Sequence, residues 1–416
     1  MNKYIYKCYD CGAEYSSKEV EKDFLYLCPV CGKAERNKPL KGVLKIEYDY
    51  KNIRENVSKQ KFLKITPGKF WQYPFLWPIK KYPSENILSR LSLISNPILN
   101  YEIEGKTIQF FDDTRNPTLS FKDRASSLVA LKALELGIKE ISVASTGNAG
   151  SSLAGICARL GIKSHIFVPK AIPEAKRIQI QSYGANIYLV DGSYDDAFDI
   201  CLEISSAKKI YNRNTAYNPL TIEGKKSAAF DMFLSLNGKL PDYIFIPVGD
   251  GVIISGLFKG FYNLKKLGWI KKYPKLIAVQ AEGSSGLVKY LEKGEFEFQT
   301  ASTIADSISA SAPRNLYMAA DAVEKTNGNA VTVKDNEIMN AQSIIAKTIG
   351  ILVEPSSAAA FAGYKKFLKA NSVSTKEKIM IMLTGNGLKD IAAVKEWITK
   401  PEVYSTKQLK ELFEIK

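Results

Sequence analysis

The sequence predicts an α/β fold in which parallel sheets are covered by helices on both faces. Two observations lead to this prediction. Short apolar segments typical of buried strands alternate with amphipathic segments typical of helices from about residue 100 onwards. Hydrophobic residues make up 45% of the 416-residue chain and charged residues 24%, proportions that allow a sizeable core. In sheets of this kind, ligands bind beyond the carboxyl ends of the strands.

The expected elements follow one another in a regular order. Strands are expected at Thr107–Phe111, Glu140–Ala144, Ser164–Val168, Asn186–Val190, Tyr243–Pro247, Lys275–Gln280 and Lys378–Leu383. Helices are expected at Phe121–Leu136, Ala149–Leu160, Pro173–Tyr183, Tyr194–Ser206, Ile222–Leu236, Asn336–Thr348 and Ser356–Leu368. The aromatic and proline-rich residues between about 50 and 100 are expected to wrap around this body.

Four of the six cysteines lie near the N-terminus as two Cys-x-x-Cys pairs, Cys8 with Cys11 and Cys28 with Cys31. Sixteen residues separate the pairs, a spacing typical of a tetrahedral zinc site. Two disulfides are the alternative, which an intracellular protein disfavours. The sequence therefore predicts a zinc ribbon over residues 1–45. Its zinc would be structural, because four thiolates leave no coordination position open.

Charge and composition exclude several classes of function. The formal net charge is +15, but the lysines are scattered among acidic residues, so nucleic-acid binding is not expected. We find neither an uncharged apolar run long enough to span a membrane nor the apolar core of a signal peptide, and we expect a cytoplasmic enzyme without a membrane partner. The single histidine, His165, lies in an expected strand, so acid–base chemistry must come from other residues.

One lysine, Lys122, lies at the start of an expected helix within the segment Asn116–Arg124. Burial and the positive end of the helix would lower the pKa of its ammonium group and favour the free amine. A free amine is what forms a Schiff base with an aldehyde cofactor. Taken alone, a solvated lysine at a helix start is the alternative interpretation.

Three further stretches contain groups that a pyridoxal 5'-phosphate (PLP) cofactor needs. Asn148, in the turn 145–150, can donate to the ring hydroxyl or can simply cap a helix. The N–H groups of residues 249–253 can hold a phosphate. Thr384 can bond the pyridine nitrogen or lie in an ordinary glycine turn; a hydroxyl there favours elimination over transamination. Together with Lys122, the ordered set predicts a PLP enzyme.

These residues resemble the motifs of threonine synthases, a branch of the PLP enzymes that share the tryptophan synthase β fold. The Ser120–Arg124 and Ser145–Asn148 motifs resemble the whole superfamily. The cysteine pairs and the closing segment Leu383–Asp390 resemble threonine synthases in particular. The resemblance covers nearly the whole chain and implies two parallel-sheet α/β lobes with a small N-terminal zinc ribbon. It also implies a homodimer and a small amino-acid substrate.

The resemblance implies a role for each site residue. Lys122 would be the catalytic residue and would bind the cofactor, with Asn148 at the ring hydroxyl and Thr384 at the ring nitrogen. The cofactor phosphate would be held by Gly249, Asp250, Gly251, Val252 and Ile253. The substrate would contact Ser145, Thr146, Thr215 and Thr221.

The resemblance also implies a division into domains. Residues 1–45 would form the zinc ribbon, and residues 46–130 with 226–400 would form a large PLP-binding lobe. Residues 131–225 would form a small mobile lobe, and residues 401–416 a helical tail.

Three places depart from the family pattern. Asp250 and Val252 stand where an asparagine and a glycine are usual, and Asn386 stands where a histidine is frequent. Thr221 occupies the position at which threonine synthases place an arginine on the substrate phosphate. The candidates to replace that arginine are Lys225, Lys226 and Arg314.

The function that we expect is a PLP-dependent lyase of the threonine synthase type, which converts O-phospho-L-homoserine and water into L-threonine and phosphate. An ammonia-lyase for threonine or serine is the alternative. A third possibility is a zinc-ribbon binding protein on a PLP scaffold without catalysis, which the presence of Lys122 argues against.

Overall fold

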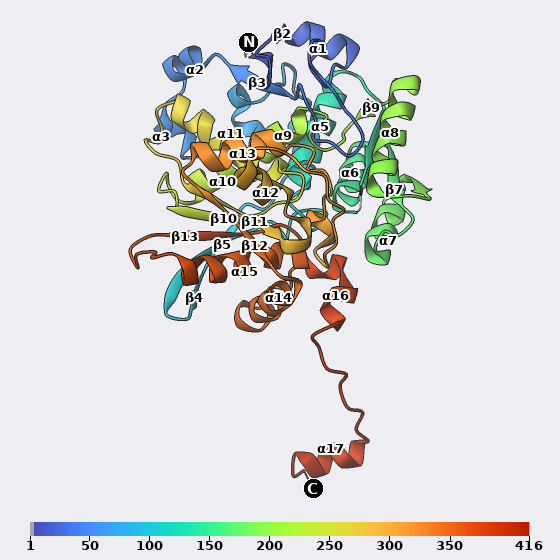
Figure 1. Cartoon of the computed structure of the whole chain (residues 1–416), viewed down its shortest axis with the longest axis vertical. Coiled ribbons are helices and arrows are strands. Elements are labelled where there is room, and N and C mark those ends of the chain that lie inside the picture. The colour runs from blue at the N-terminus through green and yellow to red at the C-terminus, as the bar shows by residue number, and fades with distance from the viewer. Residues whose placement is uncertain (1–3, 146, 416) are drawn as a thin grey trace.

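Three sheets organise the chain in the computed structural model, which describes residues 4–145 and 147–415 (Figure 1). A large sheet has the strand order β12-β11-β10-β13-β5-β4, and a small sheet has the order β8-β7-β6-β9. All neighbouring strands in these two sheets are parallel except β4 and β5, which are antiparallel. The predicted α/β class with parallel sheets is confirmed.

The expected strands are all present, with ends that differ by at most one residue. The large sheet consists of β4 (Ile98–Ile103), β5 (Lys106–Asp112), β10 (Tyr243–Pro247), β11 (Lys275–Ala281), β12 (Asn329–Val333) and β13 (Ile379–Leu383). The small sheet consists of β6 (Glu140–Ala144), β7 (Lys163–Pro169), β8 (Asn186–Val190) and β9 (Tyr211–Asn212). The sequence did not predict β4, β9 and β12. Strands β4 and β12 are edge strands with mostly half-buried or exposed residues, and β9 has only two residues.

Helices cover both faces of the large sheet, with α10, α11 and α13 on one side and α14 and α15 on the other (Figure 1). The longer helices are α5 (Asp123–Glu135), α6 (Asn148–Leu160), α7 (Glu174–Ser182), α8 (Tyr194–Lys208), α10 (Ser227–Ser235), α11 (Val252–Lys266), α12 (Gly286–Lys293), α13 (Leu316–Lys325), α14 (Asp335–Ile349) and α15 (Pro355–Ala370). The shorter ones are α1 (Ser17–Asp23), α2 (Tyr50–Asn56), α3 (Lys59–Phe62), α4 (Glu85–Ser89), α9 (Leu220–Lys225), α16 (Ile391–Lys395) and α17 (Thr406–Leu412).

The region from α9 to α11 differs from the expected helices in two ways. The helix expected at Ile222–Leu236 is divided at Lys226 into α9 and α10. Helix α11 was not expected, because it begins with three β-branched residues and contains glycines, all of which have low helix propensity. Gly256 is required by packing: a Cβ there would lie 2.6 Å from the Cβ of Lys225, so the two helices approach closely at this point. Burial therefore outweighs propensity in α11.

The N-terminal sheet has the order β2-β1-β3 and is antiparallel, with β1 at Tyr4–Cys8, β2 at Glu14–Ser16 and β3 at Leu44–Tyr48. The expected end of the ribbon at residue 45 falls inside β3. Buried charges join this sheet to the body. The ammonium group of Lys132 on α5 donates to Glu21 at 3.1 Å and to the hydroxyl of Tyr4 at 3.2 Å.

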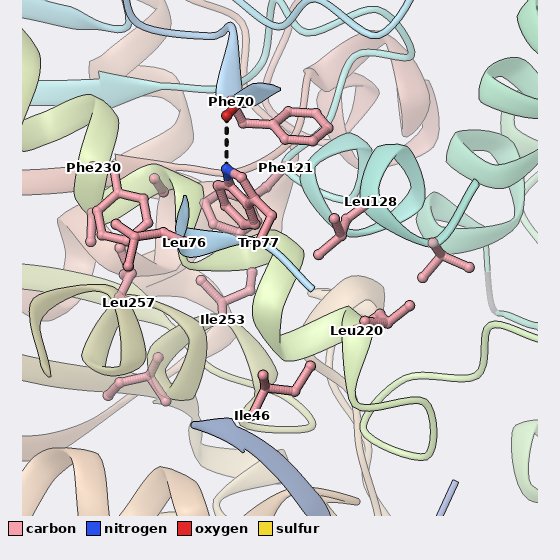
Figure 2. Packing of buried hydrophobic residues seen from close by; sticks show 14 of the residues in the cluster. Ile46, Phe70, Leu76, Trp77, Phe121, Leu128, Leu220, Phe230, Ile253 and Leu257 are labelled. Atoms are coloured by element: carbon pink, nitrogen blue, oxygen red, sulfur yellow. Dashed lines mark hydrogen bonds between the residues drawn. The ribbon is translucent and has the colours of Figure 1, made fainter. Parts of the chain in front are cut away.

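The segment before β4 wraps the body as expected and contributes aromatic residues to the main core. Trp77 is fully buried, and its indole N–H donates to the carbonyl of Phe70 at 2.7 Å (Figure 2). The same core cluster contains Phe121, Leu220 and Ile253 (Figure 2). These residues belong to three separate segments that meet in one region of the core.

A buried charge network holds the start of α5. The guanidinium group of Arg124 donates to Asp113 at 2.5 and 2.8 Å, to Asp231 at 2.6 Å and to the hydroxyl of Ser227 at 2.9 Å. All three charged side chains are at most 1% exposed. Because Asp113 follows β5 and Asp231 lies on α10, the network ties a strand end and two helices together.

The C-terminal residues leave the body. Helix α17 lies at the end of an extended segment and has no buried residue (Figure 1). No helix in the described part of the chain is long and apolar enough to cross a membrane.

Candidate active site

The loops at the carboxyl ends of β5, β6, β10 and β13 meet around one cavity. Its lining includes ten of the predicted site residues: Lys122, Ser145, Asn148, Thr215, Gly249, Asp250, Gly251, Val252, Ile253 and Thr384. Thr146 lies outside the described residues. These residues therefore meet beyond the carboxyl ends of the strands, where a ligand site is expected in sheets of this kind.

Lys122 lies at the N-terminus of α5, behind a tightly held turn. Leu119 in this turn adopts a left-handed conformation with φ of +65°, which is strained for a leucine. Two backbone hydrogen bonds to the closing segment hold the turn. The N–H of Phe121 donates to the carbonyl of Thr384 at 2.8 Å, and that of Asn386 donates to the carbonyl of Leu119 at 3.1 Å.

The ammonium group of Lys122 faces the cavity without a hydrogen-bond partner among the described residues. Burial lowers its pKa; the carboxylate of Glu354 opposes this shift and the cation of Arg213 adds to it. A lowered pKa favours the free amine, as the sequence predicted.

Asn148 is the first residue of α6, and Gly147 is the N-cap. The side chain of Asn148 does not cap the helix, so that alternative interpretation is wrong. Its amide nitrogen donates to both carboxylate oxygens of Glu354 at 2.9 Å and to the hydroxyl of Ser307 at 2.8 Å. Its amide oxygen is buried without a partner in the described structure. Asn148 is thus held in place with one polar atom left for a ligand.

Glu354 was not predicted as a site residue. It precedes Pro355, and a Glu-Pro pair at the start of a helix usually indicates only a helix boundary. Its carboxylate is 2% exposed and lies against Gly385, the residue after Thr384. The sequence gives only one hint of this role, namely an acidic residue directly before a helix.

The loop 249–253 leads into α11. Gly251 has φ of +84°, a left-handed conformation that favours glycine. The N–H of Ser255 donates to the carbonyl of Gly251, so the N–H groups before Ser255 have no partner inside the helix. They lie at the positive end of α11, where a phosphate is favoured.

The carboxylate of Asp250 accepts the backbone N–H of Arg314 at 3.1 Å. Burial raises its pKa, and the contacts with Arg314 oppose the shift. The bond to Arg314 fixes one carboxylate oxygen of Asp250 at the loop before α13.

Thr384 lines the cavity at the end of β13. Its hydroxyl lies 3.3 Å from that of Ser357, which also accepts the N–H groups of Thr384 at 2.8 Å and of Gly385 at 2.7 Å. Ser357 was not predicted, and it fixes the backbone on which Thr384 sits.

The structure does not bring Thr221 to the cavity. Its hydroxyl donates to the carbonyl of Asn218 at 2.7 Å and accepts the N–H of Ala216 at 3.2 Å. The side chain is fully buried and stabilises the turn before α9. A substrate contact through Thr221 is therefore a wrong expectation, because both hydrogen-bonding directions of the hydroxyl are used locally.

Of the three cations expected to replace the family arginine, only Lys225 lines the cavity. The ammonium group of Lys226 is paired with Glu223 and lies 4.2 Å from the ring centre of Tyr48. The guanidinium group of Arg314 is paired with Asp195 and donates to two backbone carbonyls of the N-terminal region. Lys226 and Arg314 are thus excluded as cavity cations.

The four cysteines of the N-terminal pairs lie together. Their sulfur atoms are all within 4.8 Å of one another, with 3.4 Å between Cys8 and Cys31 and 3.6 Å between Cys11 and Cys28. All four are free thiols, so the disulfide alternative does not describe the structure. Zn–S bonds of about 2.3 Å in a tetrahedral site separate the sulfurs by about 3.8 Å. The cluster therefore fits a zinc ion.

Comparison with known proteins agrees with this geometry. Residues 91–385 match the family described as pyridoxal-phosphate dependent enzyme. The chain is 35% identical to a threonine synthase of Methanocaldococcus jannaschii over 395 residues, which cover 93% of each protein. It is 34% identical to a threonine synthase of Methanosarcina acetivorans over 404 residues, 96% of each. The chain belongs to the threonine synthase family of PLP-dependent enzymes.

Solved structures show the same fold at lower sequence identity. O-ureido-L-serine synthase gives a TM-score of 0.62 with 16% identity and covers 76% of this chain and 96% of that chain. A fungal L-serine ammonia-lyase from Rhizomucor miehei gives a TM-score of 0.60 with 22% identity, and the match covers 73% of this chain and 97% of that chain. The tryptophan synthase β-like fold of this PLP-dependent enzyme is thereby confirmed.

The cavity residues fit PLP. Lys122 offers the amine, the N-terminus of α11 offers N–H groups for the phosphate, and Thr384 offers a hydroxyl for the ring nitrogen. The amide nitrogen of Asn148, expected to donate to the ring hydroxyl, is used by Glu354 and Ser307. Its buried oxygen has no partner among the described residues and can accept a hydrogen bond from a ligand hydroxyl.

Replacing Lys122 with alanine should abolish turnover and the visible absorption of the lysine-bound cofactor while leaving the fold intact. The reason is that no other described residue depends on the Lys122 ammonium group for a hydrogen bond. Borohydride reduction of the native enzyme and peptide mapping should place the pyridoxyl group on Lys122. Lys225 is the other amine that lines the cavity, and a pyridoxyl group found there would refute the assignment.

Proposed function

We propose that this enzyme is a threonine synthase that converts O-phospho-L-homoserine and water into L-threonine and phosphate. The observation that carries the proposal is the near full-length match to threonine synthases, at 34–35% identity over at least 93% of both chains. The cavity supports it, because a lysine amine, a phosphate-binding helix N-terminus and a ring-nitrogen hydroxyl meet there.

PLP, when bound, withdraws electrons from the amino acid and so acidifies its Cα proton. The amine of Lys122 is the group placed to remove this proton and to return it, and burial lowers its pKa, which favours the free base. A second proton is then removed from Cβ, the C–O bond at Cγ breaks, and phosphate leaves with the bonding electrons. One proton is delivered to Cγ and one is returned to Cα, while water adds its oxygen and one hydrogen to Cβ and gives its other proton to the released phosphate.

Thr384 suits this chemistry. A neutral hydroxyl at the ring nitrogen does not stabilise a protonated ring as a carboxylate would. The hydroxyl is held in place by Ser357, so its position does not depend on the ligand. A weaker electron sink favours elimination and addition over transamination.

Parallel steady-state assays on O-phosphohomoserine, threonine and serine test the proposal. We expect threonine and phosphate to form from O-phosphohomoserine at a kcat/KM far above that for ammonia release from the other two substrates. Ammonia release from threonine or serine as the main activity, with no threonine formed from O-phosphohomoserine, would contradict the proposal and favour the ammonia-lyase alternative.

We also propose that Cys8, Cys11, Cys28 and Cys31 bind a structural zinc ion. Four sulfurs grouped within 4.8 Å support this proposal; they come from the end of β1 with the turn after it and from the connection between α1 and β3. The metal would hold the ribbon together and take no part in the reaction, since the cluster belongs to the N-terminal sheet and none of the four cysteines lines the cavity.

Reduced, tag-free protein should contain about one zinc ion per chain. Replacing Cys8 and Cys11 with serine should remove the metal and lower the thermal stability more than the activity per folded molecule, because none of the four cysteines lines the cavity. Elemental analysis and differential scanning calorimetry measure both effects. Protein without metal but with unchanged stability would disprove the zinc site.

A further inference from the structure

The lysine and arginine side chains buried in the described residues differ in how their charge is compensated. Six of the nine have a carboxylate partner: Arg124, Lys132, Lys176, Lys226, Lys259 and Arg314. Lys389 donates to three neutral oxygens, of Thr118, Ser151 and Gln179. Two cations remain, Lys225 and Arg213, and both lie at the cavity or directly behind it.

Lys225 is the last residue of α9 and is 1% exposed, yet it lines the cavity together with Lys122 and the loop 249–252. Within the described residues its ammonium group has no hydrogen bond and no ion pair. The start of its side chain is held against α11 at Gly256. Burial lowers its pKa, the charges of Lys122 and Arg213 add to this shift, and the carboxylate of Asp250 opposes it.

Arg213 is fully buried beside the cavity residue Thr215. It donates to the hydroxyl of Thr215 at 3.4 Å and to that of Ser126 at 3.3 Å, and one of its terminal nitrogens has no described partner. Burial lowers its pKa to about 10. Unpaired buried cations are costly, so two of them at one cavity indicate that an anion binds there.

The phosphate of PLP already has a binding place in the N–H groups at the start of α11. On the proposed function, the substrate brings a second phosphate into the same cavity. A lysine ammonium group is a compact point charge that pairs well with a phosphate dianion. The cavity has one free amine beyond Lys122 among the residues that the structure describes, and Lys225 supplies it.

We propose that Lys225, supported from behind by Arg213, binds the phosphate of O-phosphohomoserine and determines the preference for a phosphorylated substrate. This inference rests on the proposed function. It places the specificity residue on α9, one turn after Thr221, whose side chain is turned away from the cavity.

The test uses holoenzyme, in which PLP occupies its own phosphate site, and inorganic phosphate as the probe. The variants are Lys225→Met, the charge-retaining Lys225→Arg and the neighbouring control Lys226→Met. Isothermal titration should show that phosphate binds native holoenzyme, and it should act as a competitive inhibitor of O-phosphohomoserine. Lys225→Met should raise the Kd of phosphate and the KM of O-phosphohomoserine about ten- to a hundredfold. Lys225→Arg should keep most of both affinities.

Stability separates this role from a structural one. Lys225→Met removes a buried amine that has no hydrogen-bond partner among the described residues, so its Tm without phosphate should equal or exceed that of the native enzyme. Lys226→Met leaves Glu223 without its cation and should lower the Tm while keeping the phosphate Kd. Phosphate should raise the Tm of the native enzyme and of Lys226→Met, but not that of Lys225→Met.

Titration of apoenzyme with PLP distinguishes the two sources of phosphate. We expect Lys225→Met to keep the PLP affinity of the native enzyme. A large loss of PLP affinity with an unchanged Kd for inorganic phosphate would assign Lys225 to the cofactor and overturn the inference. Unchanged values in every assay would overturn it as well.

The proposed function and this inference fail in different ways. Threonine synthesis by Lys225→Met with a native KM would refute the role of Lys225 and leave the function standing. Binding of phosphate that depends on Lys225, in a protein that forms no threonine, would support the anion site and refute threonine synthesis.

Discussion

The buried pairing of Arg124 with Asp113 and Asp231 is the interaction on which the active site depends. It joins the end of β5, the start of α5 and the middle of α10 where water has no access. Asp123, the residue before Arg124, accepts the N–H of Thr118 at 2.7 Å and closes the strained turn at Leu119. Lys122 directly precedes these two anchored residues, so its backbone is fixed while its side chain is free to reach the cavity.

The other buried basic groups differ in whether a carboxylate is paired with them. Cations that hold segments together have carboxylate partners, as in the contact of Lys132 with Glu21 that attaches the N-terminal sheet. The basic groups at the cavity lack such partners: the amines of Lys122 and Lys225 and the guanidinium group of Arg213. Lys389 has no carboxylate partner either, but it donates to three neutral oxygens. Buried basic groups that lack compensation of both kinds are costly, and in the described residues they lie at the cavity.

Much of the fold and part of the site could be predicted from the sequence, because both depend on local pattern. Strands such as β10 and β13 are continuous apolar runs, and polar or glycine-rich turns follow them directly. What the pattern did not reveal is side-chain direction. Lys225 and Lys226 are neighbours in sequence, but one faces the cavity and the other faces Glu223. Glu354, Ser357 and Arg213 were missed because each becomes a site residue only through contacts with distant segments.

On the proposed function, the cavity around Lys122 breaks a C–O bond and adds water to carbon. Turnover of O-phosphohomoserine in ¹⁸O-labelled water tests it most directly, because the bridging oxygen leaves with phosphate when the C–O bond breaks. Mass spectrometry should find one ¹⁸O atom in the hydroxyl group of threonine and none in the phosphate released. Label in the phosphate would show cleavage of the P–O bond by a hydrolase and would contradict the account.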